Sequence, residues 1–190
     1  MTGRIVILNG APRSGKTMLA RAVQAHVPGR WLNFGVDAFN ATLPAALLPG
    51  IGLRPGGERP DLEANLPALF GACFSAMADF AGHGFDVVAD LGLHSHYARP
   101  FDPMALLTDE LAGLSLLFVG IHCDIETIMA RRNADPQGGF YASGPGIPVP
   151  VQNWQDAVHA GKDYHLELDM GRLRPEDGAE RIAKALGTAA

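Results

Sequence analysis

Features of secreted and membrane proteins are scarce in this sequence of 190 residues. Its two cysteines, Cys73 and Cys123, form neither a disulfide framework nor a Cys-x-x-Cys metal pair, and both lie in apolar surroundings. We expect them to be buried free thiols in a reducing cytoplasm. No apolar run approaches the length that spans a membrane, and the N-terminal run ends at Asn9, too early for a signal peptide. These absences predict a soluble, cytoplasmic protein.

Positive charge is also scarce, because the formal net charge is −5 at pH 7 and no large cluster of Lys and Arg occurs. Proteins that bind the nucleic-acid backbone normally carry a basic face, so nucleic acid is not expected as the main partner. The chain instead has 47% hydrophobic and 18% charged residues, which are globular values. Its length suits a single domain, spanning residues 1–190, with a substantial core.

Short β-rich runs alternate with helical patterns along the chain, which is typical of a parallel α/β sheet. We expect strands near 4–9, 31–36, 85–89, 115–121 and 165–168. We expect helices near 17–27, 61–82, 103–112, 124–133 and 176–186. The inward face of the first helix is predicted to comprise Met18, Leu19, Ala22, Val23 and Val27.

A glycine-rich motif between the first strand and the first helix is the strongest functional signal. It comprises Gly10, Ala11, Pro12, Arg13, Ser14, Gly15, Lys16 and Thr17. Gly-x-x-x-x-Gly-Lys-Thr in this context is typical of a P-loop, whose backbone N–H groups surround phosphate. Lys16 is expected to contact the β- and γ-phosphates, and Thr17 to bind Mg²⁺. The motif and the alternating elements predict a P-loop NTPase fold of the kinase type, with a five-stranded parallel sheet and flanking helices in three layers.

Carboxylates follow four of the predicted strands, at the edge of the sheet where ligands bind in such folds. Asp37 is a candidate base for an attacking hydroxyl, with an N-cap for a helix starting at Ala38 as the alternative. Asp90 ends an apolar strand and resembles a carboxylate that holds Mg²⁺, with a strand-end cap as the alternative. Asp124 and Asp169 are interpreted as a helix cap and a turn acid.

Two segments rich in proline and glycine, 44–61 and 136–150, interrupt the pattern. We interpret them as loops over a site, within an acceptor-side segment at about 38–70 and a lid at about 133–150, although a plain surface excursion is the alternative. Arg131 and Arg132 precede the second segment, and a lid arginine would neutralise charge on the transferred phosphoryl group. We expect Arg131 to take that role and Arg132 to contact the nucleotide, while stabilisation of the helix dipole is the alternative.

A pair of histidines, His94 and His96, has the spacing of two metal ligands. No third ligand of matching spacing accompanies them. The sequence therefore favours a pair in a substrate cleft or on the surface over a zinc site.

Taken together, these motifs resemble the chloramphenicol phosphotransferase family of small P-loop kinases, which phosphorylate an antibiotic hydroxyl. The matching segments are residues 7–17, 31–37, 87–90, 119–124 and 158–169, together with Arg131. The resemblance implies ATP and Mg²⁺ as cofactors, Asp37 in the position of the base, and a homo-oligomer. Segment 38–70 matches poorly, and the arginines that usually follow in the lid are replaced by Asn133-Ala134-Asp135, so Arg13 and Arg132 are candidate substitutes.

The expected function is ATP-dependent transfer of the γ-phosphoryl group to a hydroxyl of a small molecule, such as chloramphenicol or a related metabolite. Two alternatives remain open from the sequence. One is a kinase of another metabolite, such as a sugar, a shikimate-like acid or a nucleoside. The other is a nucleotide-binding sensor with little transfer activity, which the arginine-poor lid favours and the retention of Lys16, Thr17, Asp37 and Asp90 opposes.

Overall fold

The computed structural model describes residues 2–135 and 146–187. Most of the expected lid, residues 136–145, therefore lies outside the described residues. Within the described ranges, no helix is both long enough and apolar enough to cross a membrane.

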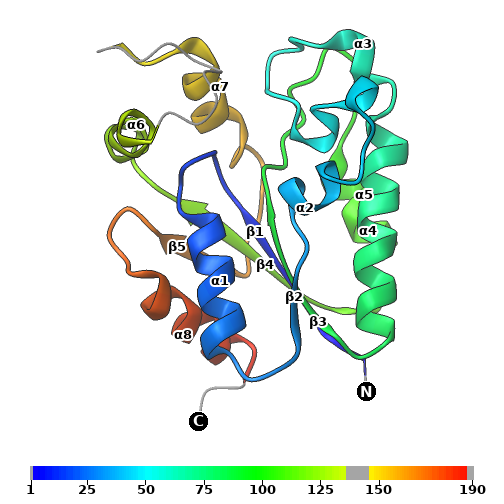
Figure 1. The fold of residues 1–190 in the computed structure, drawn as a ribbon, viewed down its shortest axis with the longest axis vertical. Coiled ribbons are helices and arrows are strands. Elements are labelled where there is room, and N and C mark those ends of the chain that lie inside the picture. Colours follow the sequence, from blue (N-terminus) through cyan, green and yellow to red (C-terminus); the bar gives the residue numbers. More distant parts are fainter. Residues whose placement is uncertain (1, 136–145, 188–190) are drawn as a thin grey trace.

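A single parallel sheet of five strands forms the centre of the described chain, in the order β2-β3-β1-β4-β5 (Figure 1). The strands are β1 (Arg4–Asn9), β2 (Trp31–Asn33), β3 (Asp86–Leu91), β4 (Ser115–His122) and β5 (Leu166–Asp169). Every neighbouring pair is parallel, with β1 between β3 and β4 in the middle of the sheet. The sequence-based prediction of a five-stranded parallel sheet is confirmed.

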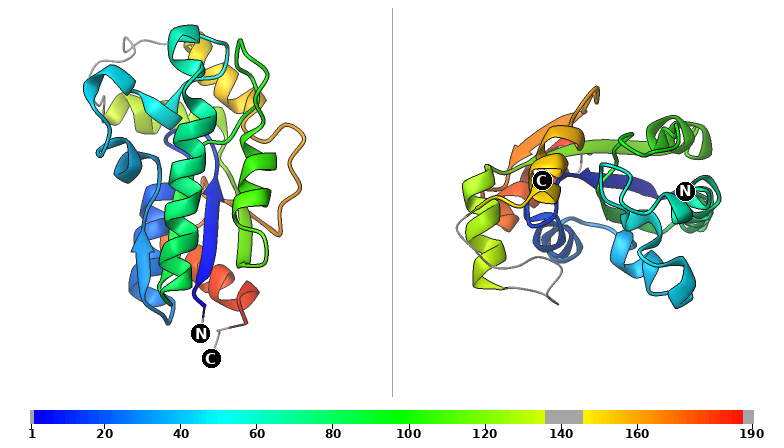
Figure 2. Two further views of the ribbon diagram at one scale, coloured as in Figure 1. Left: turned by 90° about the vertical axis from the view of Figure 1, so that its right-hand side faces the viewer. Right: turned by 90° about the horizontal axis from the view of Figure 1, so that it is seen from above.

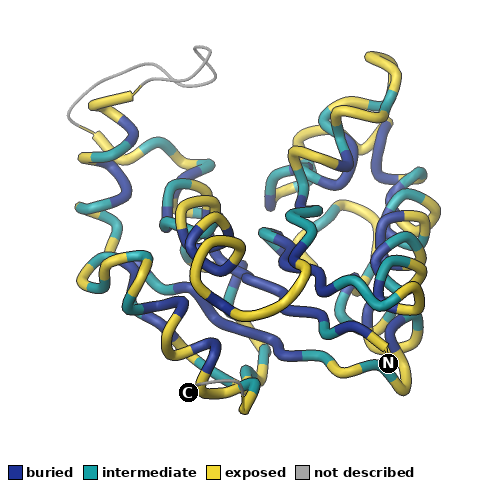
Figure 3. Tube along the Cα trace, turned by 60° about the horizontal axis from the view of Figure 1, so that its bottom comes forward, coloured by how far each residue is buried: buried dark blue, intermediate teal, exposed yellow. Residues whose placement is uncertain are grey.

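Helices cover both faces of this sheet and complete the three predicted layers (Figures 1 and 2). On one face lie α1 (Lys16–His26) and α8 (Pro175–Ala185), which share a buried core with Val6, Leu8 and Val88. On the other face lie α4 (Leu66–Gly82) and α5 (Pro103–Glu110), which pack on the opposite side chains of the same strands. Figure 3 shows the strands as largely buried and the outer helix faces as exposed.

Three predictions about these elements are wrong. The helix expected at 61–82 is interrupted and forms α3 (Pro60–Glu63) and α4, because Pro67 lacks an N–H group and fits only a first helical turn. Met18, expected on the buried face of α1, is 54% exposed. The second strand ends at Asn33 instead of residue 36, since α2 (Val36–Asn40) begins there.

The remaining elements gather at the carboxyl ends of the strands. α6 (Ile125–Ala134) and α7 (Val149–Ala157) lie on one side of this edge, and α2 and α3 lie on the other (Figure 1). Two short 3₁₀ turns, Ala45–Leu47 and Gly50–Gly52, connect α2 to the segment before α3. α7 was not expected, because its first residues fall at the end of a proline- and glycine-rich segment that reads as a loop. Pro150 occupies the first turn of that helix, where proline is tolerated.

Candidate functional site

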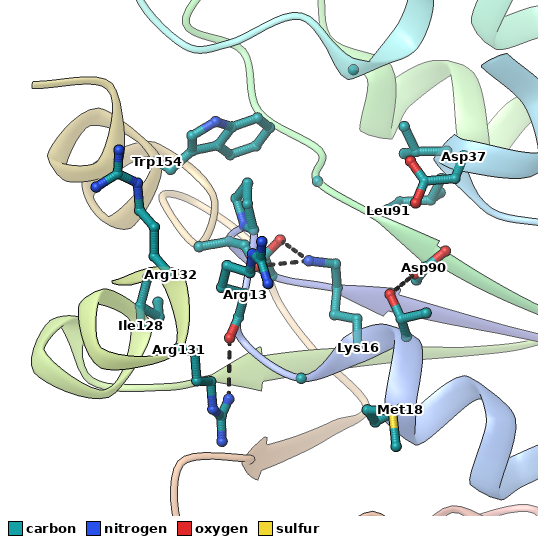
Figure 4. Close-up of a pocket in the computed structure, with 18 of the residues that line it drawn as sticks. Arg13, Lys16, Met18, Asp37, Asp90, Leu91, Ile128, Arg131, Arg132 and Trp154 are labelled. Atoms are coloured by element: carbon teal, nitrogen blue, oxygen red, sulfur yellow. Dashed lines mark hydrogen bonds between the residues drawn. The ribbon is translucent and has the colours of Figure 1, made fainter. Parts of the chain in front are cut away.

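A cleft of about 1220 Å³ opens at the carboxyl edge of the sheet, between α2 on one side and α6 and α7 on the other (Figure 4). Its lining includes the glycine-rich loop, Asp37, Asp90 and both Arg131 and Arg132. Of the site residues predicted from the sequence, all line this cleft except Ser14, which is buried beneath the loop. The fold therefore brings the predicted residues together from positions spread along the chain.

The loop between β1 and α1 has the backbone geometry of an anion-binding turn. Gly15 precedes α1 with φ of 107°, a left-handed conformation that glycine adopts without strain. Gly10 packs so closely on β4 that a Cβ atom there would lie 2.5 Å from the carbonyl oxygen of Ile121. No side chain caps α1, and its first turn contains no acid. The first N–H groups of the helix are thus available to an anion in the cleft.

Lys16 lies folded against the loop that precedes it. Its Nζ atom donates hydrogen bonds to the carbonyl oxygens of Gly10, at 2.8 Å, and Ala11, at 2.7 Å. Burial lowers the pKa of the ammonium group to about 8, although the charges of Asp90 and Asp37 oppose the shift. The group is therefore a half-buried cation beside two carboxylates and without a salt bridge of 4 Å or less to either one within the described chain.

Thr17 and Asp90 form a hydrogen-bonded pair of side chains beside Lys16. The hydroxyl of Thr17 donates to Oδ2 of Asp90 at 2.7 Å. Burial raises the pKa of Asp90, against the opposing effects of the Thr17 hydrogen bond and the Lys16 charge. Hydroxyl and carboxylate oxygens suit Mg²⁺, which usually takes one or two protein ligands and completes its shell with phosphates and water. The described residues contain no cluster of three His, Cys, Asp or Glu side chains that could hold a metal ion.

Asp37 lies across the cleft from the loop, with its carboxylate exposed (Figure 4). The alternative that it caps a helix starting at Ala38 is wrong, because α2 begins at Val36 and its N-cap is Gly35. Gly35 is required for close packing, since a Cβ atom there would lie 1.9 Å from Oδ1 of Asp90. This contact places the first turn of α2, and with it Asp37, next to the end of β3.

Arg131 connects the glycine-rich loop to the segment after β5. Its Nη1 donates to the carbonyl oxygen of Arg13 at 3.1 Å, and its Nη2 donates to that of Met170 at 2.7 Å. Arg13 in turn forms a salt bridge of 3.0 Å with Asp135 at the end of α6. These contacts make Arg131 a brace between two backbone segments, which the sequence could not indicate because both acceptors are main-chain atoms.

The two histidines of the His94-Ser95-His96 segment do not form a metal site. His94 is fully buried, with Nε2 at 2.9 Å from the carbonyl oxygen of Leu53 and Nδ1 accepting from the backbone N–H of His96 at 3.2 Å. Burial lowers the pKa of His94 to about 4, so the ring is neutral. Trp154, which lines the cleft, packs edge-on against it with ring centroids 5.1 Å apart. His94 is therefore a structural residue of the interior and not the cleft or surface residue expected from the sequence, whereas His96 is exposed.

A buried amide behind the loop was missed at the sequence level as a functional support. The side chain of Asn9 accepts from the N–H of Leu93 at 2.6 Å and donates to the carbonyl oxygen of Val158 at 2.9 Å. It also donates to the hydroxyl of Tyr164 at 2.8 Å, and that hydroxyl lies 2.7 Å from Nδ1 of His159. Asn9 thus holds the base of the loop to two other segments.

The parallel sheet and the glycine-rich loop at its edge together define a protein of the P-loop fold class. The sequence model of the chloramphenicol phosphotransferase-like protein family matches residues 3–187. The chain belongs to this family and is a phosphotransferase, which confirms the resemblance seen in the sequence.

Individual relatives are more distant. Two Mycobacterium tuberculosis proteins provisionally named O-phosphotransferases are 28% identical to this chain, over 88% of it and 75% of their own length. A sugar kinase from Janibacter has a TM-score of 0.69 at 21% identity and covers 98% of this chain and 96% of its own. The Mycobacterium tuberculosis APS kinase, solved with AMPPNP and APS, has a TM-score of 0.65 at 17% identity and covers 98% of each chain. At these identities the solved structures establish the fold alone.

Proposed function

We propose that this protein transfers the γ-phosphoryl group of ATP to a hydroxyl of a small molecule, chloramphenicol or a related metabolite. The observation that carries the proposal is that Asp37 faces the glycine-rich loop across one cleft, with Lys16, Thr17 and Asp90 between them. A base on one wall and a phosphate site on the other are what in-line transfer to an alcohol requires.

Each residue has a role that follows from its position. Asp37 accepts the proton of the acceptor hydroxyl and directs its lone pair at phosphorus. Lys16 stabilises the negative charge that develops on the transferred group, and the N–H groups of the loop and of α1 bind the phosphate oxygens. Arg131 keeps the loop in position through the carbonyl oxygens of Arg13 and Met170, and Arg132 on the same helix is proposed as a nucleotide contact.

Thr17 and Asp90 would hold Mg²⁺, which when bound supplies positive charge to the β- and γ-phosphates. Their hydrogen bond of 2.7 Å brings a hydroxyl and a carboxylate oxygen together beside the loop, which supports this assignment. Thr17 also lies at the start of α1, so its position is coupled to that of Lys16, the preceding residue.

The names of the relatives support the reaction class. The two Mycobacterium proteins are provisionally named O-phosphotransferases, and the sugar kinase and APS kinase act on small molecules. The APS kinase was solved with AMPPNP, a nucleoside triphosphate analogue, which supports ATP as the donor here. A sensor that binds nucleotide without transfer remains an outcome of the experiment below.

The test is transfer of labelled phosphate from ATP to a panel of alcohols that includes chloramphenicol, measured with the full chain and with Asp37→Asn. The variant should bind a non-hydrolysable ATP analogue normally but lose at least about a hundredfold in kcat, because it lacks the base. Asp79→Asn, which removes an exposed carboxylate of α4, is the matched control and should retain full activity. Normal turnover by Asp37→Asn would rule out Asp37 as the base, and no transfer to any acceptor would favour the sensor.

A further inference from the structure

Two arginines on the acceptor side of the cleft are not used by the mechanism above. Arg54 and Arg59 lie in the segment between the second 3₁₀ turn and α3, which follows α2 along the chain (Figure 1). Both line the main cleft and also border an adjoining cavity of about 240 Å³. The two side chains therefore stand where the acceptor half of the cleft continues toward the surface.

The cleft is rich in positive charge although the protein is acidic, with a formal net charge of −5. Among its described lining residues the cations are Arg13, Lys16, Arg21, Arg54, Arg59, Arg131 and Arg132, and the acids are Asp37, Asp90 and Asp135. A triphosphate accounts for the cations of the loop, α1 and α6, which surround the phosphate site. Arg54 and Arg59 come from a separate segment, and a triphosphate bound at the loop does not account for their place in the cleft lining.

The segment that carries Arg54 is fixed on both sides by hydrogen bonds. The carbonyl oxygen of Leu53 lies 2.9 Å from Nε2 of His94, and the N–H of Gly56 donates to the carbonyl oxygen of His96 at 2.8 Å. The carbonyl oxygen of Pro55 accepts from Asn153 of α7 at 3.5 Å. Because the backbone is held at residues 53, 55 and 56, Arg54 has a defined position. This lowers the entropic cost of binding a ligand to it.

Arg59 is positioned in a similar way through the short helix that follows it. Glu63 of α3 is buried and accepts from the N–H groups of Ala98, at 2.9 Å, and Arg99, at 2.8 Å. These bonds hold α3, and therefore the residue before it, against the segment after β3. Hydrogen bonds that an ionised carboxylate accepts are stronger than those between two neutral groups.

The carboxylates that contact these arginines are exposed and exchangeable. Arg54 pairs with Glu58 at 3.2 Å, with side chains 24% and 42% exposed. Arg59 pairs with Asp61 at 2.8 Å, with side chains 48% and 60% exposed, and binds both carboxylate oxygens. Exposed pairs of this kind contribute little, so the oxyanion of a ligand can replace the protein carboxylate.

We propose that the acceptor is an anionic alcohol, whose carboxylate, phosphate or sulfate binds Arg54 and Arg59 while its hydroxyl faces Asp37. The lining between these groups includes Val36, Pro49 and Ile51, which suits an apolar carbon skeleton. This inference rests on the proposed function and narrows its substrate class to alcohols that carry an anionic group, so neutral chloramphenicol is expected to be a weaker acceptor than an anionic metabolite.

The experiment compares acceptors in pairs, using the full chain with Mg²⁺ and ATP. Hydroxy-carboxylates are tested against their methyl esters, and phosphorylated alcohols against the corresponding neutral alcohols, so that the two sources of an oxyanion are separated. The acid of at least one pair should have a KM at least about tenfold lower than its neutral partner, and Arg54→Ala/Arg59→Ala should remove that preference. Arg181→Ala, which removes an exposed arginine of α8, is the matched control and should retain it.

Two further variants should strengthen the preference for the acid over its neutral partner. Glu58→Gln and Asp61→Asn remove the competing carboxylates, so each should lower the KM of the preferred acid by about threefold without changing that of its neutral partner. A purely structural role of the arginines would give loss of activity in Arg54→Ala/Arg59→Ala, Glu58→Gln and Asp61→Asn alike, for acids and neutral acceptors equally. Thermal melting of each variant confirms that it is folded.

Equal KM values for the acids and their neutral partners would overturn the inference and leave the proposed function intact. If no acceptor is phosphorylated, the proposed function fails, and binding of the same probes is then measured with the protein saturated by a non-hydrolysable ATP analogue. Acid-selective binding that is lost in Arg54→Ala/Arg59→Ala would support the anion site in that case. No selectivity among the bound probes would overturn it.

Discussion

Lys16 illustrates how the protonation of a single residue can depend on whether an anion is bound. Its ammonium group is half-buried in the cleft lining and donates only to the carbonyl oxygens of Gly10 and Ala11 among the described residues, and desolvation lowers its pKa to about 8. A phosphate group beside it would favour the charged form and raise that pKa. Nucleotide binding is therefore coupled to protonation of Lys16.

The coupling predicts that affinity for a non-hydrolysable ATP analogue falls as the pH rises through the pKa of the free site. From about pH 8 to about pH 9.5 the dissociation constant should increase by about tenfold, because an increasing fraction of Lys16 must take up a proton to bind. Isothermal titration calorimetry at several pH values measures this, and buffers of different ionisation enthalpy report the proton uptake directly.

Lys16→Ala provides the control for this prediction. The variant should bind the analogue more weakly at every pH and with no proton uptake from this source, so its affinity should be flat over the same interval. A wild-type affinity that is also flat would contradict the assignment of Lys16 as a phosphate ligand.

At the scale of elements, the glycine-rich loop depends on segments that are distant in the sequence. Arg131 of α6 connects the carbonyl oxygen of Arg13 in the loop to that of Met170 after β5. Two charge-assisted bonds of this kind restrict the loop without using any side chain of the loop itself. The geometry of the phosphate site is therefore set partly by α6 and β5.

Removal of this brace should affect the nucleotide more than the fold. We expect Arg131→Ala to raise the KM for ATP by about tenfold or more and to lower kcat, because the loop is no longer held in one conformation. Steady-state kinetics, with an acceptor found in the panel proposed above, measure both values. Arg172→Ala, which removes an arginine whose side chain is 86% exposed, should leave them unchanged. An unchanged KM for ATP in Arg131→Ala would show that the loop is rigid without the brace.

The elements also show which structure the sequence could predict. The five strands and the loop were predictable because apolar runs and a glycine motif are local signals. The early end of β2 was not, since it depends on the fit of Gly35 against Asp90, two residues far apart in the sequence. The exposure of Met18 was also missed, because an apolar residue that lines an open cleft has the same local pattern as one in the core.

Prediction of the candidate site from the sequence is limited in the same way, because it detects local patterns and not contacts between distant residues. Lys16, Thr17, Asp37 and Asp90 could be predicted as lining the cleft, because each carries a characteristic chemistry and lies at or just beyond the carboxyl end of a predicted strand. The roles of Asn9 and Arg131 could not be read from sequence, because their partners are mainly backbone atoms of other segments. The proximity of Arg54 and Arg59 to the cleft depends on the anchoring of residues 53 and 56 to the histidine pair, which no spacing rule indicates.

Across the whole molecule, a second charged cluster lies at the opposite end of the sheet from the cleft. Asp86, at the start of β3, accepts hydrogen bonds from the backbone N–H and the side chain of Arg4, at the start of β1, at 2.7–2.9 Å. Arg4 also donates to the carbonyl oxygen of Pro28 and lies over the ring of Trp31, 5.0 Å from its centroid. This cluster ties together the two central strands and the connection from α1 to β2.

The cluster makes stability depend on acid pH in a defined direction. Burial alone would raise the pKa of Asp86, but the hydrogen bonds and charge of Arg4 outweigh it and hold the pKa below its ordinary value. Since the folded state has the lower pKa, the contribution of Asp86 is complete above the unfolded value of about 3.9 and is lost as the pH falls through the folded one.

Asp86→Asn should therefore separate stability from function. At pH 7 we expect it to lower the free energy of unfolding by about 2 kcal/mol, because the variant leaves Arg4 beside a neutral amide. Urea denaturation measures this difference, which should narrow below about pH 4 as the wild-type carboxylate becomes protonated. The kinetic constants for phosphoryl transfer should stay at wild-type values at temperatures where both proteins are folded, because the cluster lies at the amino end of the strands and the cleft at the carboxyl end. A loss of activity without a loss of stability would show that the two ends of the sheet are coupled.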